Sequence, residues 1–459
     1  LPGADQQAAA YTAAEAAALA AAGTPLAAAD RYAEAVELAR RIRLAPADWL
    51  PWALAGVTAL TLGGRIDQAT AQGRELAAVA RRAGEPVLFG QAALLATGPW
   101  VPMGAASRRA QLLLGEALEW VPADQTALRV RLMEGYLRAG KVGDPTMLAR
   151  LGDMEPETLR HAADPDPTVA LDALRALHSL TWPRQQPSQR RLELSQRMAV
   201  VAARAGSAEA ELEALRTIVT AHIELADRLG AAAAAQDYQR RAEASGSVLH
   251  RWVAITLSEL LAGLSGPTAA AARHAERARA LQAGVDPETV ALTGHERLLS
   301  DAVRDDRLVD LAPAFEALDD EISEVDPLYQ LVAAGIAAEL GRPPSLDYLE
   351  QLWNSVRGTF RAGVAAGLIV GALGGAQPAP EFADELAAEL AVYSGGWLPI
   401  GGSAGIGPAD AHLARLLRRR GADEASARHA RLATSVAHRF APAWVRFTQK
   451  EHPHAEDRS

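Results

Sequence analysis

Cysteine is absent from the 459 residues, which excludes disulfide bonds, thiolate zinc sites, iron–sulfur clusters and cysteine nucleophiles. Lysine is nearly absent, since Lys141 and Lys450 are the lysines of the chain and arginine supplies the other positive charges. Aromatic residues make up 5% of the sequence, and the formal net charge is −10. An acidic chain lacks the basic field that attracts phosphate backbones. We therefore expect no direct nucleic-acid partner.

Long apolar runs are also missing. The least charged stretch, residues 362–376, contains five glycines in 15 residues, which is too short and too weakly apolar for a membrane span. We predict that it forms a core helix. The sequence begins Leu-Pro-Gly, without the basic segment and apolar run of a signal peptide. These features predict a cytoplasmic location with no membrane partner, in a chain that is either complete or a fragment of a longer protein.

Alanine is abundant, and it is the residue that most favours helix, whereas the aromatic residues favoured in sheets are scarce. Segments of about 12–20 residues carry apolar side chains at helical spacing, and short breaks of Gly, Pro, Asp or Ser separate them. No segment alternates with period two, so no strand is predicted. The pattern predicts an all-α fold, an α-α superhelix of tetratricopeptide-like helical repeats with a period of roughly 34–40 residues.

One repeat is clearly marked between Trp49 and Pro86. Two amphipathic segments flank a turn at residues 63–67, and the second ends in Arg81-Arg82-Ala83-Gly84. Basic ends closed by glycine recur at Gly206 and Gly230. Because glycine readily adopts the left-handed conformation that closes a helix, we predict that helices end at these three positions.

Two breaks in the rhythm predict domain boundaries. Residues 163–167 read Ala-Asp-Pro-Asp-Pro, and residues 182–187 carry two further prolines, so both stretches are expected to form elbows. The predicted organisation has four parts, which are N-terminal repeats at 1–162, central repeats at 163–392, a glycine-rich loop with a C-terminal helix pair at 393–450, and a frayed tail at 451–459.

Motifs for catalysis or cofactor binding fail on inspection. The glycine-rich loop continues as Pro408-Ala409-Asp410 after Gly407, where a phosphate-binding loop needs Lys followed by Ser or Thr. His295-Glu296 lacks the second histidine of a zinc protease motif, because residue 299 is leucine. We therefore predict no catalytic residue, no cofactor and no metal. Other histidines occur singly and are predicted at the surface or its boundary, namely His178, His222, His250, His274 and His412.

Carboxylates gather at Asp305-Asp306, at residues 319–321 and between Glu381 and Glu389. Paired carboxylates perform acid–base chemistry only where their surroundings separate their pKa values. On amphipathic helices the more common use of such residues is a solvated face. We predict that they lie on helix surfaces or helix ends.

The nine tryptophans are the most informative side chains. Most lie in amphipathic segments and are predicted to fill the core between alanine-rich helices. Trp397 differs because it lies in the glycine-rich loop at residues 393–408, where its ring either pins the loop or forms the wall of a binding site. The candidate residues for binding a ligand or partner are Trp353, Arg357, Tyr393 and Trp397.

Three stretches carry a family resemblance, at residues 32–40, 191–230 and 393–436. In the last of these, Gly401-Gly402-Ser403 precedes a helix pair that contains residues 412–416 and 423–425. The chain resembles the tetratricopeptide-like helical region of large ATP-binding LuxR-type transcriptional regulators and related actinobacterial multidomain signalling ATPases. The resemblance implies a sensor or scaffold arm that follows a nucleotide-binding module and, in some members, precedes a DNA-binding domain. Because the Walker lysine is missing, nucleotide hydrolysis is not expected in this chain.

The predicted function is a non-catalytic binding arm that captures a protein, a peptide or a small effector and relays the event to an attached nucleotide-binding or DNA-binding domain. Two alternatives stay open. One is an all-helical enzyme whose site lies near residues 393–408, and the other is a free-standing interaction scaffold. A buried acid or base with a shifted pKa, beside a pocket near that loop, would favour the enzyme.

Overall fold

A computed structural model describes residues 2–139 except 64 and 99–103, residues 156 and 158–316 except 267 and 286, residues 327–400, and residues 404–449. The chain forms two compact units that divide between Ser179 and Leu180. This division lies beside the elbow expected at residues 182–187. The domain limits at residues 162, 392 and 450 stay predictions. The predicted tail at 451–459 and the loop centre at 401–403 lie outside the described residues.

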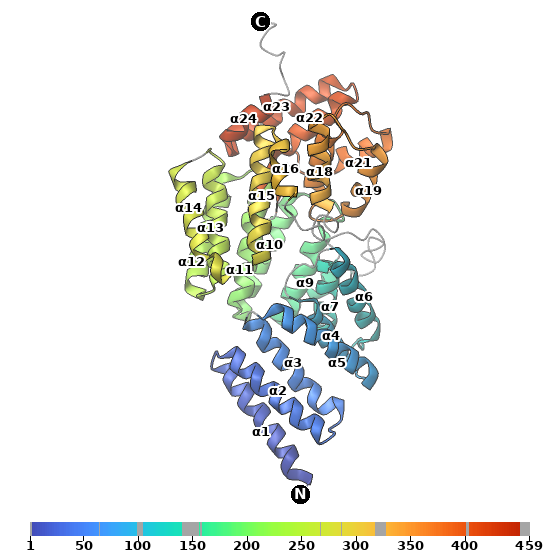
Figure 1. Ribbon diagram of the computed structural model, residues 1–459, viewed down its shortest axis with the longest axis vertical. Coiled ribbons are helices and arrows are strands. Elements are labelled where there is room, and N and C mark those ends of the chain that lie inside the picture. The colour runs from blue at the N-terminus through green and yellow to red at the C-terminus, as the bar shows by residue number, and fades with distance from the viewer. Residues whose placement is uncertain are drawn as a thin grey trace. The chain divides into compact units, whose positions relative to one another are not determined.

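The first unit is built from helices that each pack on the next along the chain, from α1 through α7 (Figure 1). Prolines begin several of them, as suits a position where the backbone N–H needs no partner. The helices are α1 (Pro2–Ala21), α2 (Pro25–Arg41), α3 (Pro46–Leu62), α4 (Ile66–Ala83), α5 (Pro86–Thr97), α6 (Gly104–Trp120), α7 (Thr126–Ala139) and α9 (Pro167–Leu180).

The helix pair predicted between Trp49 and Pro86 is confirmed as α3 and α4. Gly84 and Gly206 close their helices in the left-handed conformation, with φ of 76° and 65°. The prediction at Gly230 is wrong, because this glycine lies inside the following helix. There Ala226 takes the left-handed conformation instead, and the side chain of Asp227 caps the next helix by accepting a hydrogen bond from the Gly230 backbone N–H.

The second unit begins with five helices that also pack in chain order, α10 to α14 (Figure 1). Side-chain caps from Ser207, Asp227, Ser247 and Thr268 begin four of them. The elements up to residue 316 are α10 (Ser188–Ala205), α11 (Ala208–Glu224), α12 (Arg228–Ser245), α13 (Val248–Gly263), α14 (Ala269–Leu281), η1 (Gln282–Gly284), α15 (Pro287–Asp305), η2 (Leu308–Leu311) and α16 (Ala312–Glu316).

The C-terminal part packs differently, because helices there also contact elements that are not their neighbours in the chain. Its elements are α18 (Pro327–Glu339), α19 (Leu346–Val356), α20 (Ala362–Ala372), α21 (Pro380–Val392), β1 (Trp397–Ile400), β2 (Ala404–Pro408), α22 (Ala409–Arg419), α23 (Asp423–Phe440), η3 (Pro442–Trp444) and α24 (Val445–Gln449).

Helix α20 is the centre of this part. It contacts α18, α19, α21, α22 and both strands, and all of its residues except Gly371 are buried. A helix that is apolar all round is buried on every side, so the core helix predicted for residues 362–376 is confirmed as far as Ala372, where the helix ends. Its small side chains allow the surrounding elements to approach closely.

Strands β1 and β2 form an antiparallel hairpin, which corrects the prediction that the chain has no strand. Ile400 pairs with Ala404, and Trp397 pairs with Pro408 across an irregular register. All nine residues of the two strands except Pro399 are buried. Alternation of apolar and polar residues appears only when one face of a sheet meets solvent, so a hairpin buried on both faces leaves no such signal in the sequence.

Within the described residues the architecture is otherwise helical, and the predicted all-α helical-repeat fold class is confirmed. In those same residues no helix has the length and hydrophobicity needed to cross a bilayer.

Candidate functional site

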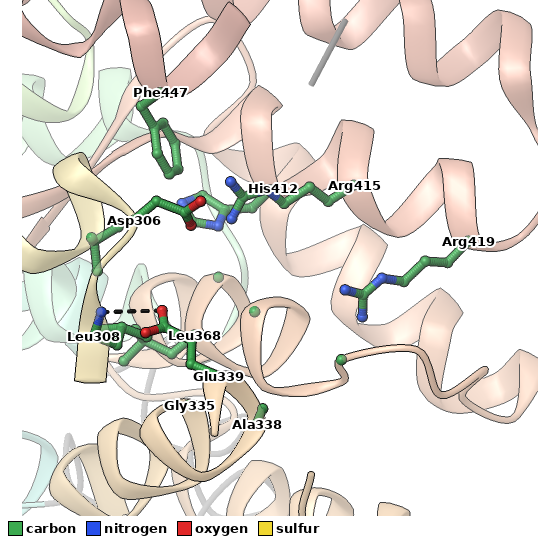
Figure 2. Close-up of a pocket in the computed structure, with 14 residues that line it drawn as sticks. Asp306, Leu308, Gly335, Ala338, Glu339, Leu368, His412, Arg415, Arg419 and Phe447 are labelled. Atoms are coloured by element: carbon green, nitrogen blue, oxygen red, sulfur yellow. Dashed lines mark hydrogen bonds between the residues drawn. The ribbon is translucent and has the colours of Figure 1, made fainter. Parts of the chain in front are cut away.

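A pocket of about 280 Å³ opens in the C-terminal part of the second unit (Figure 2). Its walls come from the end of α15 and the start of η2, the end of α18, the face of α20, and helices α22 and α24. The residues that line it are Val303, Asp306, Leu308, Gly335, Ala338, Glu339, Gly367, Leu368, Gly371, Gly374, His412, Arg415, Arg419 and Phe447.

Glycines of α20 create the open space. Gly367 and Gly371 are one turn apart and line the pocket, and Gly374 continues the same face beyond the helix end. A Cβ placed at Gly371 would meet no atom within 4 Å, so it would project into the pocket. A Cβ placed at Gly367 would lie 2.6 Å from the Cδ1 atom of Ile406 and 3.3 Å from the Cγ and Nδ1 atoms of His412. Glycine at 367 therefore makes room for the Ile406 side chain and for the imidazole.

His412 is 2% exposed and His178 is 6% exposed, which corrects the prediction that these two histidines lie at the surface or its boundary. His412 lies on the buried face of α22, over Gly367, and its Nε2 is 2.9 Å from the carbonyl oxygen of Ile406 in β2. A carbonyl only accepts hydrogen bonds, so Nε2 carries the proton. Burial, with a further contribution from the charge of Arg415, lowers the pKa of His412 to about 4. The ring is therefore neutral at neutral pH.

Two arginines of α22 face the pocket one helical turn apart, Arg415 and Arg419. The guanidinium carbon of Arg415 lies 4.7 Å from the centroid of the Phe447 ring, a cation–π contact. The imidazole of His412 packs on the same ring, with 5.7 Å between the centroids. In Figure 2 the Arg419 guanidinium lies apart from this group.

Carboxylates from two other elements complete the pocket. Asp306 follows α15 with a φ of 57°, a left-handed conformation that aspartate tolerates better than most residues. Glu339 ends α18, and its two oxygens accept hydrogen bonds from the backbone N–H groups of Leu308 (3.1 Å) and Val309 (2.8 Å) (Figure 2). Glu339 thereby caps the start of η2 and fixes one wall. The pocket combines two cations, two carboxylates and a neutral imidazole.

The lining residues limit which chemistry the pocket could perform. The 14 lining residues include no serine, threonine, cysteine, lysine or tyrosine that would act as a nucleophile. An effective general acid or base has a pKa near the working pH, and His412 lies well below it. In the part of the chain that the structure describes, no three His, Asp or Glu side chains are placed to hold a metal ion.

The titration of His412 predicts an acid-sensitive fold. The pKa of His412 in the folded state, about 4, lies below the ordinary value of 6.5. The contribution of the neutral ring to the free energy of unfolding is therefore fully present above pH 6.5. It is lost as pH falls from 6.5 through 4, by up to about 3 kcal/mol. We expect the difference in unfolding free energy between wild type and His412→Gln to shrink over this range. Urea unfolding at a series of pH values measures it, and a difference that stays constant with pH would contradict the assignment.

Two of the sequence-predicted binding residues, Trp353 and Arg357, meet at the C-terminal end of α19. Trp353 is 3% exposed, and its Nε1 donates a hydrogen bond to Glu385 at 2.7 Å. Arg357 reaches the same Glu385 oxygen at 3.5 Å. Their shared partner lies on α21, so these contacts join α19 to α21. Neither residue lines the pocket.

The other two, Tyr393 and Trp397, are buried at 5% and 1% exposure. Tyr393 lies under the guanidinium of Arg191, 5.4 Å away. Trp397 packs on Phe440 and Trp444, with centroids 5.2 and 5.1 Å apart. The burial matches the interpretation in which Trp397 pins its own loop. A ligand-binding role for the four residues stays a prediction.

Trp397 is nonetheless connected to the pocket. Its partner Trp444 packs edge-on against Phe447 at 5.5 Å, and Phe447 forms the pocket wall. Trp397 therefore does not line the pocket, and the rings of Trp444 and Phe447 lie between it and the pocket. His412 and the arginines were missed because nothing in their spacing in the sequence marks them as pocket residues. The glycines at 367, 371 and 374 did carry a signal, because their spacing places them on one face of a helix.

A buried ion pair lies at the start of the second unit. The Nε of Arg191, which is 2% exposed, donates to Glu224, which is 5% exposed, at 2.7 Å. Its other nitrogens donate to Ser188 Oγ and the Gln186 carbonyl. Glu389 is 3% exposed, which corrects the prediction that this carboxylate lies on a solvated face. Burial raises the pKa of Glu389, partly offset by the hydrogen bond from Gln185 and the charge of Arg191.

No family model matches the chain, and no curated protein does. Among solved structures, the crystal structure of yeast Tom70 is similar at 11% identity and a TM-score of 0.27, covering 97% of this chain and 96% of that one. A circular tandem repeat protein with a novel repeat topology is similar at 13% identity and a TM-score of 0.16, covering 97% and 90%.

Proposed function

We propose that the chain is a non-catalytic helical-repeat binding arm and that the pocket of the second unit takes a small effector. The observation that supports this proposal is that polar side chains converge on a space that α20 leaves open. Ligand sites are concave, with a few placed polar groups on an otherwise apolar wall. Here Leu368, Phe447 and the glycines supply the apolar surface, and His412 with Arg415 supplies the polar groups.

The alternative of an all-helical enzyme gains one supporting observation. His412 is a buried base with a lowered pKa, beside a pocket, and it is hydrogen-bonded to the β2 strand of the 393–408 segment. Binding is the better interpretation, because a base of this pKa is poorly matched to neutral pH and no serine, threonine, cysteine, lysine or tyrosine lines the pocket.

The test uses a substitution that fills the space. Gly371→Leu is expected to keep the fold, because the added side chain begins in open space and leucine favours helix more than glycine does. It should abolish the binding of any ligand held in the pocket. A thermal-shift screen of a small-metabolite library against wild type and this variant measures the effect. A ligand present at 100 times its Kd is expected to stabilise wild type by about 2.7 kcal/mol.

Gly375→Leu is the matched control, since Gly375 also faces open space, follows four residues later and does not line the pocket. The control should keep the ligand response. Hits that stabilise wild type and both variants equally bind elsewhere and would contradict the proposed site, and a library without hits would contradict the effector function.

We further propose that this arm works in a regulatory protein. The sequence resemblance supports a sensor arm attached to a nucleotide-binding or DNA-binding domain, with a protein or peptide partner as well as the effector. An occupied pocket would fix the ends of α15 and α18 against α20 and α22, which gives a physical route from ligand to neighbouring helices. Hydrogen exchange of these helix ends with and without an identified ligand tests this, and equal protection in both states would count against relay.

A further inference from the structure

We propose that the outer face of α23, formed by Arg428, Arg431, Leu432 and Arg439, binds an acidic helical segment of a partner protein. This inference rests on the proposed function of the chain as a binding arm, and it names the surface and the chemistry of the protein partner. None of the four residues lines the effector pocket.

The outer face carries exposed arginines that the chain leaves unpaired. Helix α23 packs on α22, α24, η3 and β2, and these four residues are exposed. Arg428 and Arg431 lie one helical turn apart, and Leu432 beside them is 40% exposed. Among the described residues neither Arg428 nor Arg431 has an ion-pair partner. Arg439 donates a hydrogen bond to the Gly395 carbonyl at 3.3 Å.

The position of the two unpaired arginines in the helix is also unusual. Exposed arginines elsewhere, such as Arg81 and Arg190, pair with a glutamate. An arginine in the last turn of a helix complements the helix dipole, which accounts for Arg439 but not for Arg428 and Arg431 in the middle of α23. Like charges one turn apart repel each other. A partner that brings carboxylates to this face would remove the repulsion.

The charges and the single exposed leucine favour an acidic protein segment over other anionic partners. The chain has a net charge of −10, so a nucleic acid that extends past this face would be repelled. A membrane-binding helix inserts an apolar face into the bilayer, but the apolar face of α23 is buried against its neighbours. A short acidic segment matches a cationic face that Asp423 and Glu424 bound at the start of the helix.

The spacing of the face fits a partner helix. Arg428 and Arg439 are three helical turns apart, about 16 Å. Carboxylates one turn apart on a partner helix would meet the arginines, and an apolar side chain among them would meet Leu432. Exposed charge pairs mainly set orientation and the rate of association, so the leucine contact adds the specificity.

The test measures binding of a synthetic acidic helix to the full chain by fluorescence anisotropy at low ionic strength. One peptide carries glutamates and a leucine on one face and alanine elsewhere, and a second peptide has alanine in place of that leucine. The double substitution Arg428→Glu with Arg431→Glu is expected to weaken the leucine peptide at least about tenfold. Leu432→Ala should weaken the leucine peptide and leave the alanine peptide unchanged, because the two leucines contact each other.

Arg273→Glu with Arg277→Glu on α14 is the matched control. These arginines are also exposed, one turn apart and without an ion-pair partner in the described part of the chain, but no exposed leucine accompanies them. The control should bind the leucine peptide as wild type does, and both double variants should keep the helical circular dichroism of wild type. Gly371→Leu should also bind the peptide normally, which separates this face from the pocket.

Four outcomes overturn the inference. They are a leucine peptide that does not bind wild type, equal weakening by the charge reversals on α23 and α14, a Leu432→Ala variant that weakens both peptides alike, and tighter binding of duplex DNA or of phosphatidylserine vesicles through Arg428 and Arg431. If the peptide binds as expected while no metabolite distinguishes wild type from Gly371→Leu, the effector pocket fails and this surface stands.

Discussion

Replacing Arg191 by alanine is expected to lower the free energy of unfolding by about 3–5 kcal/mol. The substitution removes the guanidinium that pairs with buried Glu224 at 2.7 Å and whose charge also favours ionised Glu389. Both carboxylates would then stay in the interior without their cation. Removing one partner of a buried ion pair is strongly destabilising, because it leaves a buried charge without compensation. Equilibrium urea unfolding followed by tryptophan fluorescence measures the loss.

The neighbouring residue supplies the control. Arg190 pairs with Glu193 in a surface contact, with side chains that are 38% and 48% exposed. Arg190→Ala is expected to cost no more than about 1 kcal/mol. The double substitution Arg191→Met with Glu224→Met should recover most of the stability lost in Arg191→Ala, because an apolar pair of similar volume leaves no unpaired charge. Equal losses in Arg191→Ala and Arg190→Ala would show that the buried pair is not as described.

Trp397→Ala is expected to lower the unfolding free energy by a comparable amount, about 3–5 kcal/mol. The ring is among the largest fully buried side chains and packs on Phe440 and Trp444. Its removal would leave a cavity in the centre of the C-terminal part, under the wall formed by Phe447. The same denaturation experiment measures this change.

Tyr348→Ala serves as the comparison, since Tyr348 is also aromatic, lies in the same unit and is 39% exposed. We expect it to cost less than about 1 kcal/mol, because little of its contact is lost from a packed interior. If Trp397→Ala lowers the unfolding free energy as little as Tyr348→Ala does, the Trp397 ring is not part of the core. It would then again be a candidate for the wall of a binding site.

The helices were predictable from the sequence because each carries its own signal. Gly84 and the proline starts act within a few residues, and helical apolar periodicity is a local pattern. The hairpin was not predictable in this way. Its two strands are covered by elements from distant parts of the chain. Helices α11 and α20 contact β1, and α20 and α23 contact β2, so apolar and polar residues do not alternate along the strands.

The pocket was predictable only in part. Glycines spaced at 367, 371 and 374 indicate a helix face without side chains, but they do not say whether another helix or a cavity lies against it. His412 has no sequence partner that marks it as buried, because its hydrogen-bond acceptor is a backbone carbonyl and its space is the missing Cβ of Gly367. Glu389 was misplaced for a similar reason, since Gln185, its partner, is 204 positions away.

The state of the His412 ring tests the account most directly, and nitrogen NMR of ¹⁵N-histidine-labelled protein measures it, with His412→Gln used to assign the resonances. At pH 7 we expect a neutral ring with a protonated Nε2 and an unprotonated Nδ1, because Nε2 donates to the Ile406 carbonyl and burial lowers the pKa of His412 to about 4. A charged ring at pH 7, or a neutral ring with the proton on Nδ1, would contradict the buried His412 that donates to Ile406.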